Sequence, residues 1–481
     1  MSSVRKSFLL SLADSYLGIV LQIVGTVVIS RLLTPAEVGV FAITAVFVML
    51  AGMFRDFGVA EYLIQEQDLT KERIRATLAL NILVSWAMAL TLAVAAPFLA
   101  DFYREEGVQS VMWVQALNLM MVPFGAVTLA WFRRQLNYTP IVICNVLASV
   151  ATLVVSVGLA LSGYGYMSLA WGSFAGIAAT VISSMVLKPR ELPRWPSFKG
   201  MAHVFHFGKF ASSIYLIGQL GKGAPELIIG RVENAASVGF FSRANGIVEM
   251  FNRLLLRPAM NVCLPYFARG KRDGGSVSAS YLLSVSMLTA VGWPFLAVLA
   301  ICAFPAIRLI YGEQWVVAVP LSRILCLAMA VELVHALSRE ALIACGSVKR
   351  ANTLQMQLVV VQVCGLAGGI GFGLQAACWG MVVAAALGVG IAQWHLTREF
   401  GFGWLALLGA CRLSGGLALV TAAPLLVAAW WIPADEQNYV RWGLCAGSLS
   451  VLLWLATAWR LDHQLWRELT AVVARRRRPA P

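Results

Sequence analysis

The sequence predicts an all-α protein that crosses a membrane many times. Charged residues make up 12% of the 481 residues and hydrophobic residues 59%, whereas about a quarter of a soluble protein is charged. A hydrocarbon layer roughly 30 Å thick needs about 20 apolar residues per helical crossing, and the chain supplies many runs of that length. The first run, from Phe8 to Leu33, is long enough to remain in the membrane as an anchor.

Apolar runs broken by charged and turn-forming residues predict about fourteen transmembrane helices. We expect them at residues 8–32, 36–54, 74–99, 109–132, 140–161, 166–187, 207–230, 236–256, 279–302, 317–338, 352–373, 376–397, 404–430 and 440–459.

The distribution of basic residues between the loops supports this number of crossings. Of the 37 Lys and Arg residues, 26 fall on the side that carries Arg5 and Lys6, and 5 fall on the opposite side. Cytoplasmic loops of membrane proteins are enriched in Lys and Arg. We therefore expect both termini in the cytoplasm. The net charge of +14 then reflects inner-face loops and the Arg475–Arg478 tail rather than a nucleic-acid partner.

One short segment occurs twice, 200 residues apart. Residues 27–41 read VVISRLLTPAEVGVF and residues 227–241 read LIIGRVENAASVGFF. In each copy an apolar helix ends near an Arg, a polar turn follows, and a second helix opens at Val-Gly. The recurrence predicts two related halves of six helices each, in parallel orientation, with a substrate path between them.

The Pro-rich segment KPRELPRWPSFKG, residues 188–200, is expected to be a stiff, non-helical cytoplasmic linker between the halves. The predicted division is an N-terminal six-helix lobe at 1–187, the linker at 188–200, a C-terminal six-helix lobe at 201–400, an additional helix pair at 401–460 and a basic cytoplasmic tail at 461–481.

Several chemistries find no support in the sequence. The nine cysteines show no CxxC pair or other metal-ligand spacing, so we expect no metal site. No GxxxxGK[ST] loop is present, so ATP is not expected to act within this chain, and no cofactor is predicted. The predicted outer loops around 302–316 and 431–439 offer Arg308, Glu313, Asp435 and Glu436 and little else, which argues against an enzyme.

A set of short motifs resembles one family of transporters over about residues 5–460. The motifs are the Arg31–Phe41 turn, Arg55-Asp56-Phe57-Gly58 before Leu63-Ile64-Gln65, Phe132-Arg133-Arg134-Gln135-Leu136, His206-Phe207-Gly208, and Tyr311-Gly312-Glu313-Gln314-Trp315 before Pro320. In order and spacing they resemble Wzx-type oligosaccharide-lipid flippases, in the polysaccharide transport branch of the multidrug/oligosaccharidyl-lipid/polysaccharide exporter superfamily.

The resemblance implies two six-helix bundles around a central cavity, with two extra helices, in the bacterial inner membrane. It implies that undecaprenyl-diphosphate-linked sugar repeat units move from the cytoplasmic to the outer leaflet. The implied partners are this lipid-linked oligosaccharide, membrane lipids and the polysaccharide polymerase and export machinery. The alternatives are a multidrug or lipid-II-type exporter of the same superfamily and, less favoured, a membrane enzyme such as a polymerase.

Candidate site residues follow from the charge of a diphosphate, because polar groups inside a membrane bundle are costly and hence functional candidates. The predicted substrate cavity consists of Lys222, Arg243, Glu226, Arg323, Asn245 and Gln22. Candidates for coupling or gating are Glu249, Glu332, His335 and the helix-bending Pro225. Two structural alternatives remain open: Lys222 and Glu226, one turn apart, could form a neutralising pair, and Arg243 and Arg323 could extend to the outer surface.

Overall fold

A computed structural model of the chain describes residues 2–56, 62–64, 66, 69–193, 195–198, 201–431 and 437–460. For residues 2–15, 56 and 202–217 it describes the backbone alone. The predicted basic tail at 461–481 lies outside the described residues. Every regular element within these ranges is a helix, which confirms the predicted all-α class.

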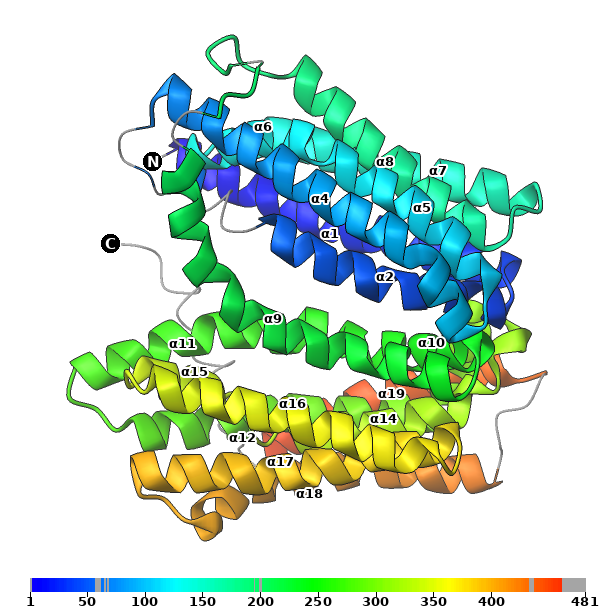
Figure 1. The fold of residues 1–481 in the computed structure, drawn as a ribbon. Helices are drawn as coiled ribbons and strands as arrows, with labels where there is room; N and C mark the ends of the chain where they lie inside the picture. The colour runs from blue at the N-terminus through cyan, green and yellow to red at the C-terminus, as the bar shows by residue number, and fades with distance from the viewer. Residues whose placement is uncertain are drawn as a thin grey trace. The chain divides into compact units, whose positions relative to one another are not determined.

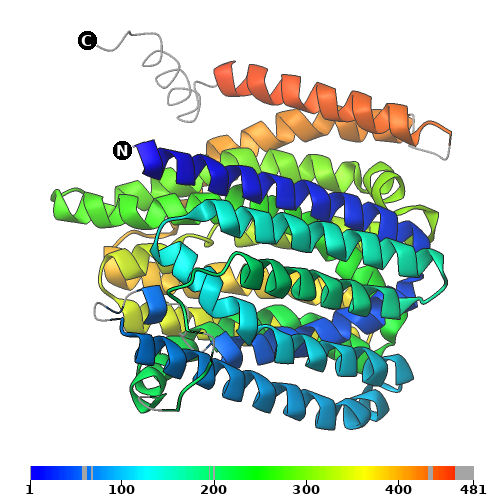
Figure 2. The same cartoon turned by 90° about the horizontal axis from the view of Figure 1, so that it is seen from above.

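The chain forms two compact units, Met1–Gly239 and Phe240–Pro481. The first contains α1 (Ser2–Leu32), α2 (Pro35–Asp56), α4 (Lys71–Tyr103), α5 (Glu106–Met121), α6 (Pro123–Arg134), α7 (Tyr138–Leu161), α8 (Tyr166–Val186) and α9 (Met201–Val232). In this unit α7 packs against α8 and α1, and α4 packs against α5 and α9 (Figures 1 and 2). The boundary between the units falls within α10 (Ala235–Phe251).

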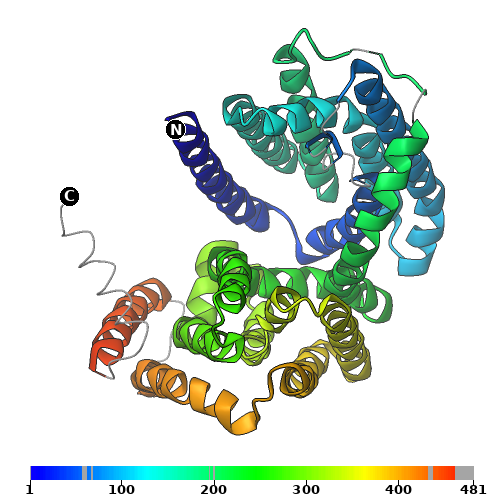
Figure 3. The ribbon, with the colours of Figure 1, turned by 90° about the vertical axis from the view of Figure 1, so that its left-hand side faces the viewer.

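The second unit contains the remaining helices. They are η1 (Asn252–Leu256), α11 (Arg257–Arg272), α12 (Val277–Ile301), α13 (Ala303–Tyr311), η2 (Glu313–Trp315), α14 (Ala318–Glu332), α15 (Ser338–Ala344), α16 (Val348–Ile370), α17 (Leu374–Phe400), α18 (Trp404–Trp431) and α19 (Tyr439–Arg460). Here α16 packs against α17 and α12 against α18, while α19 packs against α18 (Figure 3).

Each of the fourteen predicted segments consists mostly of helix, formed by one helix or by two consecutive ones. Nine helices among the described residues are long and apolar enough to cross a membrane. The number becomes ten if α5 and α6, which meet at 48°, form one bent crossing. The chain is therefore a multi-pass membrane protein, and the number fourteen stays a prediction.

Three predicted crossings differ from the helices observed, of which the one expected at 109–132 is divided into α5 and α6 at Val122. The crossing expected at 317–338 is interrupted: α14 ends at Glu332, turns follow, and α15 begins at Ser338. The crossing expected at 236–256 does not end there, because a π-helical turn, η1, joins α10 to α11 and the helical path continues to Arg272. A π-helical turn keeps the backbone hydrogen-bonded, so no loop is needed at that point.

The repeated turn has the same local structure in both copies. Thr34 and Glu37 form a capping box at the start of α2: the Thr34 amide donates to Glu37 Oε2 at 2.7 Å and the Glu37 amide to Thr34 Oγ1 at 3.4 Å. Asn234, the equivalent of Thr34, caps α10 by accepting from the Ser237 amide at 2.9 Å. Both copies thus end one helix and begin the next at equivalent residues.

The two copies also touch each other within the first unit, through their glycines. A Cβ atom added to Gly39 would collide with the carbonyl oxygen of Ala235, and one added to Gly239 would collide with that of Pro35. Pro35 and Ala235 are themselves equivalent positions of the repeat. The contact is therefore reciprocal, and it requires residues without a side chain so that the backbones can approach closely.

The described parts of the Pro-rich linker are non-helical and lie against the first unit. Leu192 is buried in an apolar cluster with Leu78 of α4 and Val127 of α6. The Arg75 guanidinium donates to the carbonyl of Trp195 at 3.1 Å, and the Ser197 amide donates to the Arg75 carbonyl at 3.1 Å. Helix α9, which follows the linker, packs on α2 and α4. The lobe boundaries drawn from the repeat stay a prediction, since the compact units divide later, at Gly239.

Candidate functional site

Arg243 is the clearest candidate for binding an anion in the second unit. It projects from α10 onto two neighbouring aromatic rings, with its guanidinium carbon 5.5 Å from the Tyr311 ring centre and 5.4 Å from the Trp315 ring centre. Its Nε atom is buried and has no hydrogen-bond partner among the described residues. No ion pair joins it to a carboxylate in the described part of the chain. The geometry leaves a cation whose charge is offset only by ring faces.

Tyr311 and Trp315 were not predicted as site residues, although both belong to a motif that carries the family resemblance. They come from the end of α13 and from η2, with Trp315 fully buried and its ring 6.1 Å from that of Phe240. The rings hold Arg243 in place and block its extension to water on their side. The sequence signal was present in the motif, but its partner lies about seventy residues earlier in the chain.

Arg308 provides a contrast within the same unit. Its guanidinium also lies over aromatic rings, 5.9 Å from Phe304 and 5.3 Å from Tyr439. Unlike Arg243, it has a carboxylate nearby, with Glu313 Oε2 at 3.7 Å from Nη2. The Tyr439 contact links α13 to α19, so Arg308 has a structural explanation.

Lys222 and Glu226 do not form the neutralising pair that was one alternative. No ion pair or hydrogen bond joins their side chains in the described part of α9. Lys222 is exposed, whereas Glu226 has a buried Oε2 atom without a partner. Lys222 and Glu226 are neighbours on α9 because they are one turn apart, but one side chain is exposed and the other is partly buried.

The remaining cavity candidates divide by their local contacts. Arg323 is exposed and donates from Nε to the Ala300 carbonyl at 3.3 Å, near the carboxyl end of α12, where a cation complements the helix dipole. Asn245 is half-buried on α10 and Gln22 is exposed on α1.

The coupling candidates are also placed separately. Glu249 is neutralised locally, with Arg257 Nη2 at 2.7 Å and Arg253 Nε at 3.7 Å. Glu332 is the last residue of α14, and His335 lies in the turns that follow, rather than one turn further along the same helix as expected. Gly388 of α17 leaves room for this imidazole, because a Cβ there would meet His335 Nε2 at 3.1 Å.

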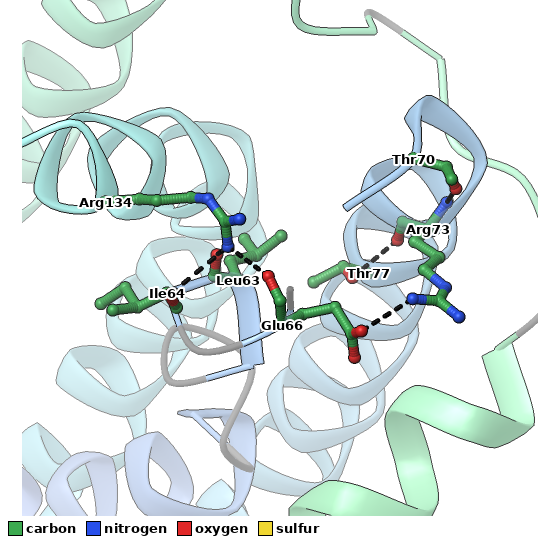
Figure 4. A network of polar contacts seen from close by, with 7 residues as sticks. All are labelled: Leu63, Ile64, Glu66, Thr70, Arg73, Thr77 and Arg134. Atoms are coloured by element: carbon green, nitrogen blue, oxygen red, sulfur yellow. Dashed lines mark hydrogen bonds and ion pairs between the residues drawn. The ribbon is translucent and has the colours of Figure 1, made fainter. Parts of the chain in front are cut away.

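Two further family motifs meet at one end of the first unit (Figure 4). Arg134, at the end of α6, donates from Nη1 to the carbonyls of Leu63 at 2.9 Å and Glu66 at 2.6 Å. The Glu66 carboxylate pairs with Arg73 Nη1 at 2.7 Å. These contacts give the Arg134 motif a structural function, because Arg134 donates hydrogen bonds to carbonyls that lack a helical partner.

The predicted bending point lies in α9, which curves part-way along its length (Figure 1). Pro225 lies inside the helix and removes one backbone donor. A Cβ on Gly218 would meet nothing within 4 Å, whereas one on Gly223 would collide with Val46 Cγ1 of α2. A Gly218→Ala substitution therefore tests the flexibility of the helix without a steric clash, whereas Gly223→Ala would add a clash.

We expect Pro225→Ala and Gly218→Ala to slow transport while folded yield stays near that of the wild type. Alanine restores the missing donor at 225 and narrows the backbone freedom at 218. Transport rates normalised to protein level measure the effect, with Gly158→Ala in the open surroundings of α7 as the control. Wild-type rates in both variants would remove bending of α9 from the mechanism.

Comparison with known proteins places these features in a family. Residues 28–320 match the family model described as "Polysaccharide biosynthesis protein". The teichuronic acid biosynthesis protein TuaB of Bacillus subtilis is 25% identical over 322 residues, covering 64% of each chain. The succinoglycan biosynthesis transport protein ExoT of Rhizobium meliloti is 25% identical over 316 residues, covering 65% of this chain and 63% of that protein. The chain thus spans slightly less than two thirds of these relatives' length.

Among solved structures, the lipid II flippase MurJ in an inward closed conformation superposes with a TM-score of 0.77. The alignment covers 96% of this chain and 100% of MurJ at 11% sequence identity, so the likeness concerns the fold. The family match covers more than half of the chain and includes the repeated turn, Arg243 and the Tyr311–Trp315 motif. The resemblance drawn from the motifs is confirmed: this chain belongs to the polysaccharide biosynthesis protein family, the family of Wzx-type transporters.

Proposed function

We propose that this protein flips a diphosphate-linked oligosaccharide lipid from the cytoplasmic to the outer leaflet, for assembly of a cell-surface polysaccharide. It acts as a transporter and not as an enzyme, by alternating access between its two six-helix lobes. The proposal extends to this chain what the names of its relatives state of them: TuaB and ExoT belong to polysaccharide biosynthesis, ExoT is called a transport protein, and MurJ is a lipid flippase.

The observation that carries the proposal is the unpaired cation at Arg243. A buried charge without a partner costs several kcal/mol, so such groups persist where a ligand completes them. A diphosphate supplies the missing negative charge, and guanidinium groups bind phosphate oxygens through directed hydrogen bonds. The buried rings of Tyr311 and Trp315 hold this guanidinium in place for such a ligand.

The same observation weighs against a multidrug exporter of cationic compounds. A cationic drug would be repelled by Arg243, whose positive charge no described carboxylate offsets. Glu226 is the group that favours the alternative, because one of its oxygens is buried without a partner. A proton on Glu226 would remove that negative charge, whereas a guanidinium keeps its charge at any accessible pH.

A reconstituted assay tests the function directly. Vesicles containing the purified protein and a fluorescent undecaprenyl-diphosphate sugar lipid are exposed to an impermeant quencher. Flipping predicts that quenching proceeds beyond the outer leaflet at a rate that depends on the protein and falls in Arg243→Ala. Transport of a cationic dye without movement of the lipid would establish the drug-exporter alternative instead.

We further propose that the chain lies in the inner membrane with both termini in the cytoplasm. Tags after Pro481 and near Gly200 should be inaccessible from outside intact cells, whereas labels near Gly163 and Gln437 should react. The two internal loops provide the sharper test, because an externally reactive 200 loop combined with a cytoplasmic C-terminus would overturn the fourteen-helix arrangement. The polymerase and export machinery are the protein partners this location provides.

A further inference from the structure

Each half of the chain contains one crossing whose helix is interrupted, and the two interruptions occupy equivalent positions. In the first unit α5 ends at Met121, and α6 starts at Pro123 with its axis bent by 48°. In the second unit α14 ends at Glu332, and α15 starts at Ser338. Both are the fourth predicted crossing of their half.

A tryptophan from the preceding crossing reaches each interruption. Trp86 of α4 donates from Nε1 to the carbonyl of Met120 at 3.2 Å. Trp293 of α12 donates from Nε1 to the carbonyl of Ala330 at 2.7 Å. Both acceptors lie in the last turn of the helix that ends there. In both units, therefore, a tryptophan from the third predicted crossing donates to a carbonyl at the end of the helix that is interrupted.

The spacing in the sequence agrees with this equivalence. Trp293 follows Trp86 by 207 residues, whereas the repeated turns are 200 residues apart. Seven residues are about two turns of an α-helix, so the extra residues leave the tryptophan on nearly the same helix face.

The indole supplies a hydrogen bond that the interrupted backbone lacks. In the second unit the Val334 amide donates to Val331 at 3.2 Å rather than to Ala330, whose carbonyl accepts from Trp293 instead. The Tyr281 hydroxyl similarly donates to the Val334 carbonyl at 3.3 Å. In the first unit the amides of Gly125 and Ala126 both donate to the Val122 carbonyl, and the Met120 carbonyl accepts from Trp86 instead. Unpaired carbonyls at membrane depth are costly, so the bent form depends on these side-chain donors.

The segment beyond each interruption is tied to a neighbour at its far end. Arg134, at the end of α6, holds the carbonyls of Leu63 and Glu66. Lys271 of α11 donates to the carbonyl of Cys345, just after α15, at 2.6 Å. A rotation of α6 or α15 about its interruption would therefore displace the segment to which it is tied.

We propose that the fourth crossing of each half is a hinge, and that Trp86 and Trp293 are positioning residues that hold the two hinges in their bent form. Loss of the indole leaves the carbonyl without a donor, so the bent form becomes less stable and the amides around the interruption open more often. The proposal does not depend on the identity of the transported molecule.

Hydrogen–deuterium exchange on the purified full-length protein tests the proposal. Trp86→Phe should raise the exchange of amides 124–126, and Trp293→Phe that of amides 334–338, each by about five- to tenfold, the effect of losing one hydrogen bond. Each variant should leave the other hinge unchanged. Trp379→Phe is the matched control, because Trp379 of α17 is exposed and its indole makes no hydrogen bond to the described residues.

A second substitution separates the hydrogen bond from the ring's packing. Benzothienylalanine at position 86 or 293 replaces the indole N–H by sulfur and keeps the ring shape. It should reproduce the faster exchange, and it remains informative if the phenylalanine variants fold poorly. Unchanged exchange at both hinges with the sulfur analogue, or an equal increase at the hinges in the Trp379 variant, would overturn the proposal.

Discussion

Polysaccharide export should fall roughly tenfold or more when Arg243 is replaced by alanine, since a hydrogen bond to a charged group contributes about 1.5–3 kcal/mol. Tyr311 and Trp315 remain in place in this variant, so the loss reports the missing cation rather than a collapsed pocket. Lipid-linked repeat units should accumulate on the inner leaflet. Their amount, measured at matched protein level, checks the expectation.

Lys222→Ala should impair export in the same way, because Lys222 also has no ion-pair partner among the described residues. Arginine at this position should retain more function than glutamine, since the charge matters more than the shape. Arg308→Ala is the matched control: it removes an arginine that also lies over aromatic rings but has Glu313 nearby. Wild-type export from the Lys222→Ala, Arg243→Ala double variant would contradict an anion-binding role for both residues.

The second large effect concerns the glycines of the repeated turn. Gly239→Ala should lower the thermal stability of the purified protein and its folded yield, because the new methyl group would overlap the Pro35 carbonyl oxygen. Overpacking of this kind costs about 1–3 kcal/mol, and the obstacle is backbone that cannot change rotamer. Gly39→Ala should behave alike, since its obstacle is the equivalent carbonyl of Ala235.

The control for these variants is Gly158→Ala in α7, where nothing lies within 4 Å of the added atom. Alanine is favoured over glycine inside a helix by up to about 1 kcal/mol, so this change should be neutral or stabilising. Melting temperatures of the three variants give the comparison. If the melting temperature of Gly239→Ala equals that of Gly158→Ala, the close backbone contact is not required for the fold.

Much of the fold could be predicted because membrane helices follow from long apolar runs. Most of every predicted segment is helical, and the repeated turn has the predicted form. The interruption after Glu332 could not be predicted, because residues 333–337 contain neither Gly nor Pro. Its carbonyls are satisfied by Trp293 and Tyr281, about forty to fifty residues earlier in the chain. A local pattern cannot reveal such a partner.

The sequence predicted which charged residues are candidates for the site, but it did not predict which of them form ion pairs. Selecting charged residues inside the predicted crossings identified Arg243 and Lys222, but the same rule also selected Glu249, which Arg257 neutralises. The spacing of Lys222 and Glu226 suggested an ion pair that the described structure does not contain. Spacing along a helix gives proximity of positions, whereas the direction of each side chain depends on the neighbouring helices.

The Pro-rich linker is attached to the first unit by its own contacts and not only by the continuity of the chain. Backbone hydrogen bonds at Trp195 and Ser197, and the buried Leu192, fix this segment to the first unit, and α9 then packs on α2 and α4. A chain cut within the linker would therefore keep its two fragments together through packing alone. The covalent link at residues 188–200 is therefore not what holds α9 on the first unit.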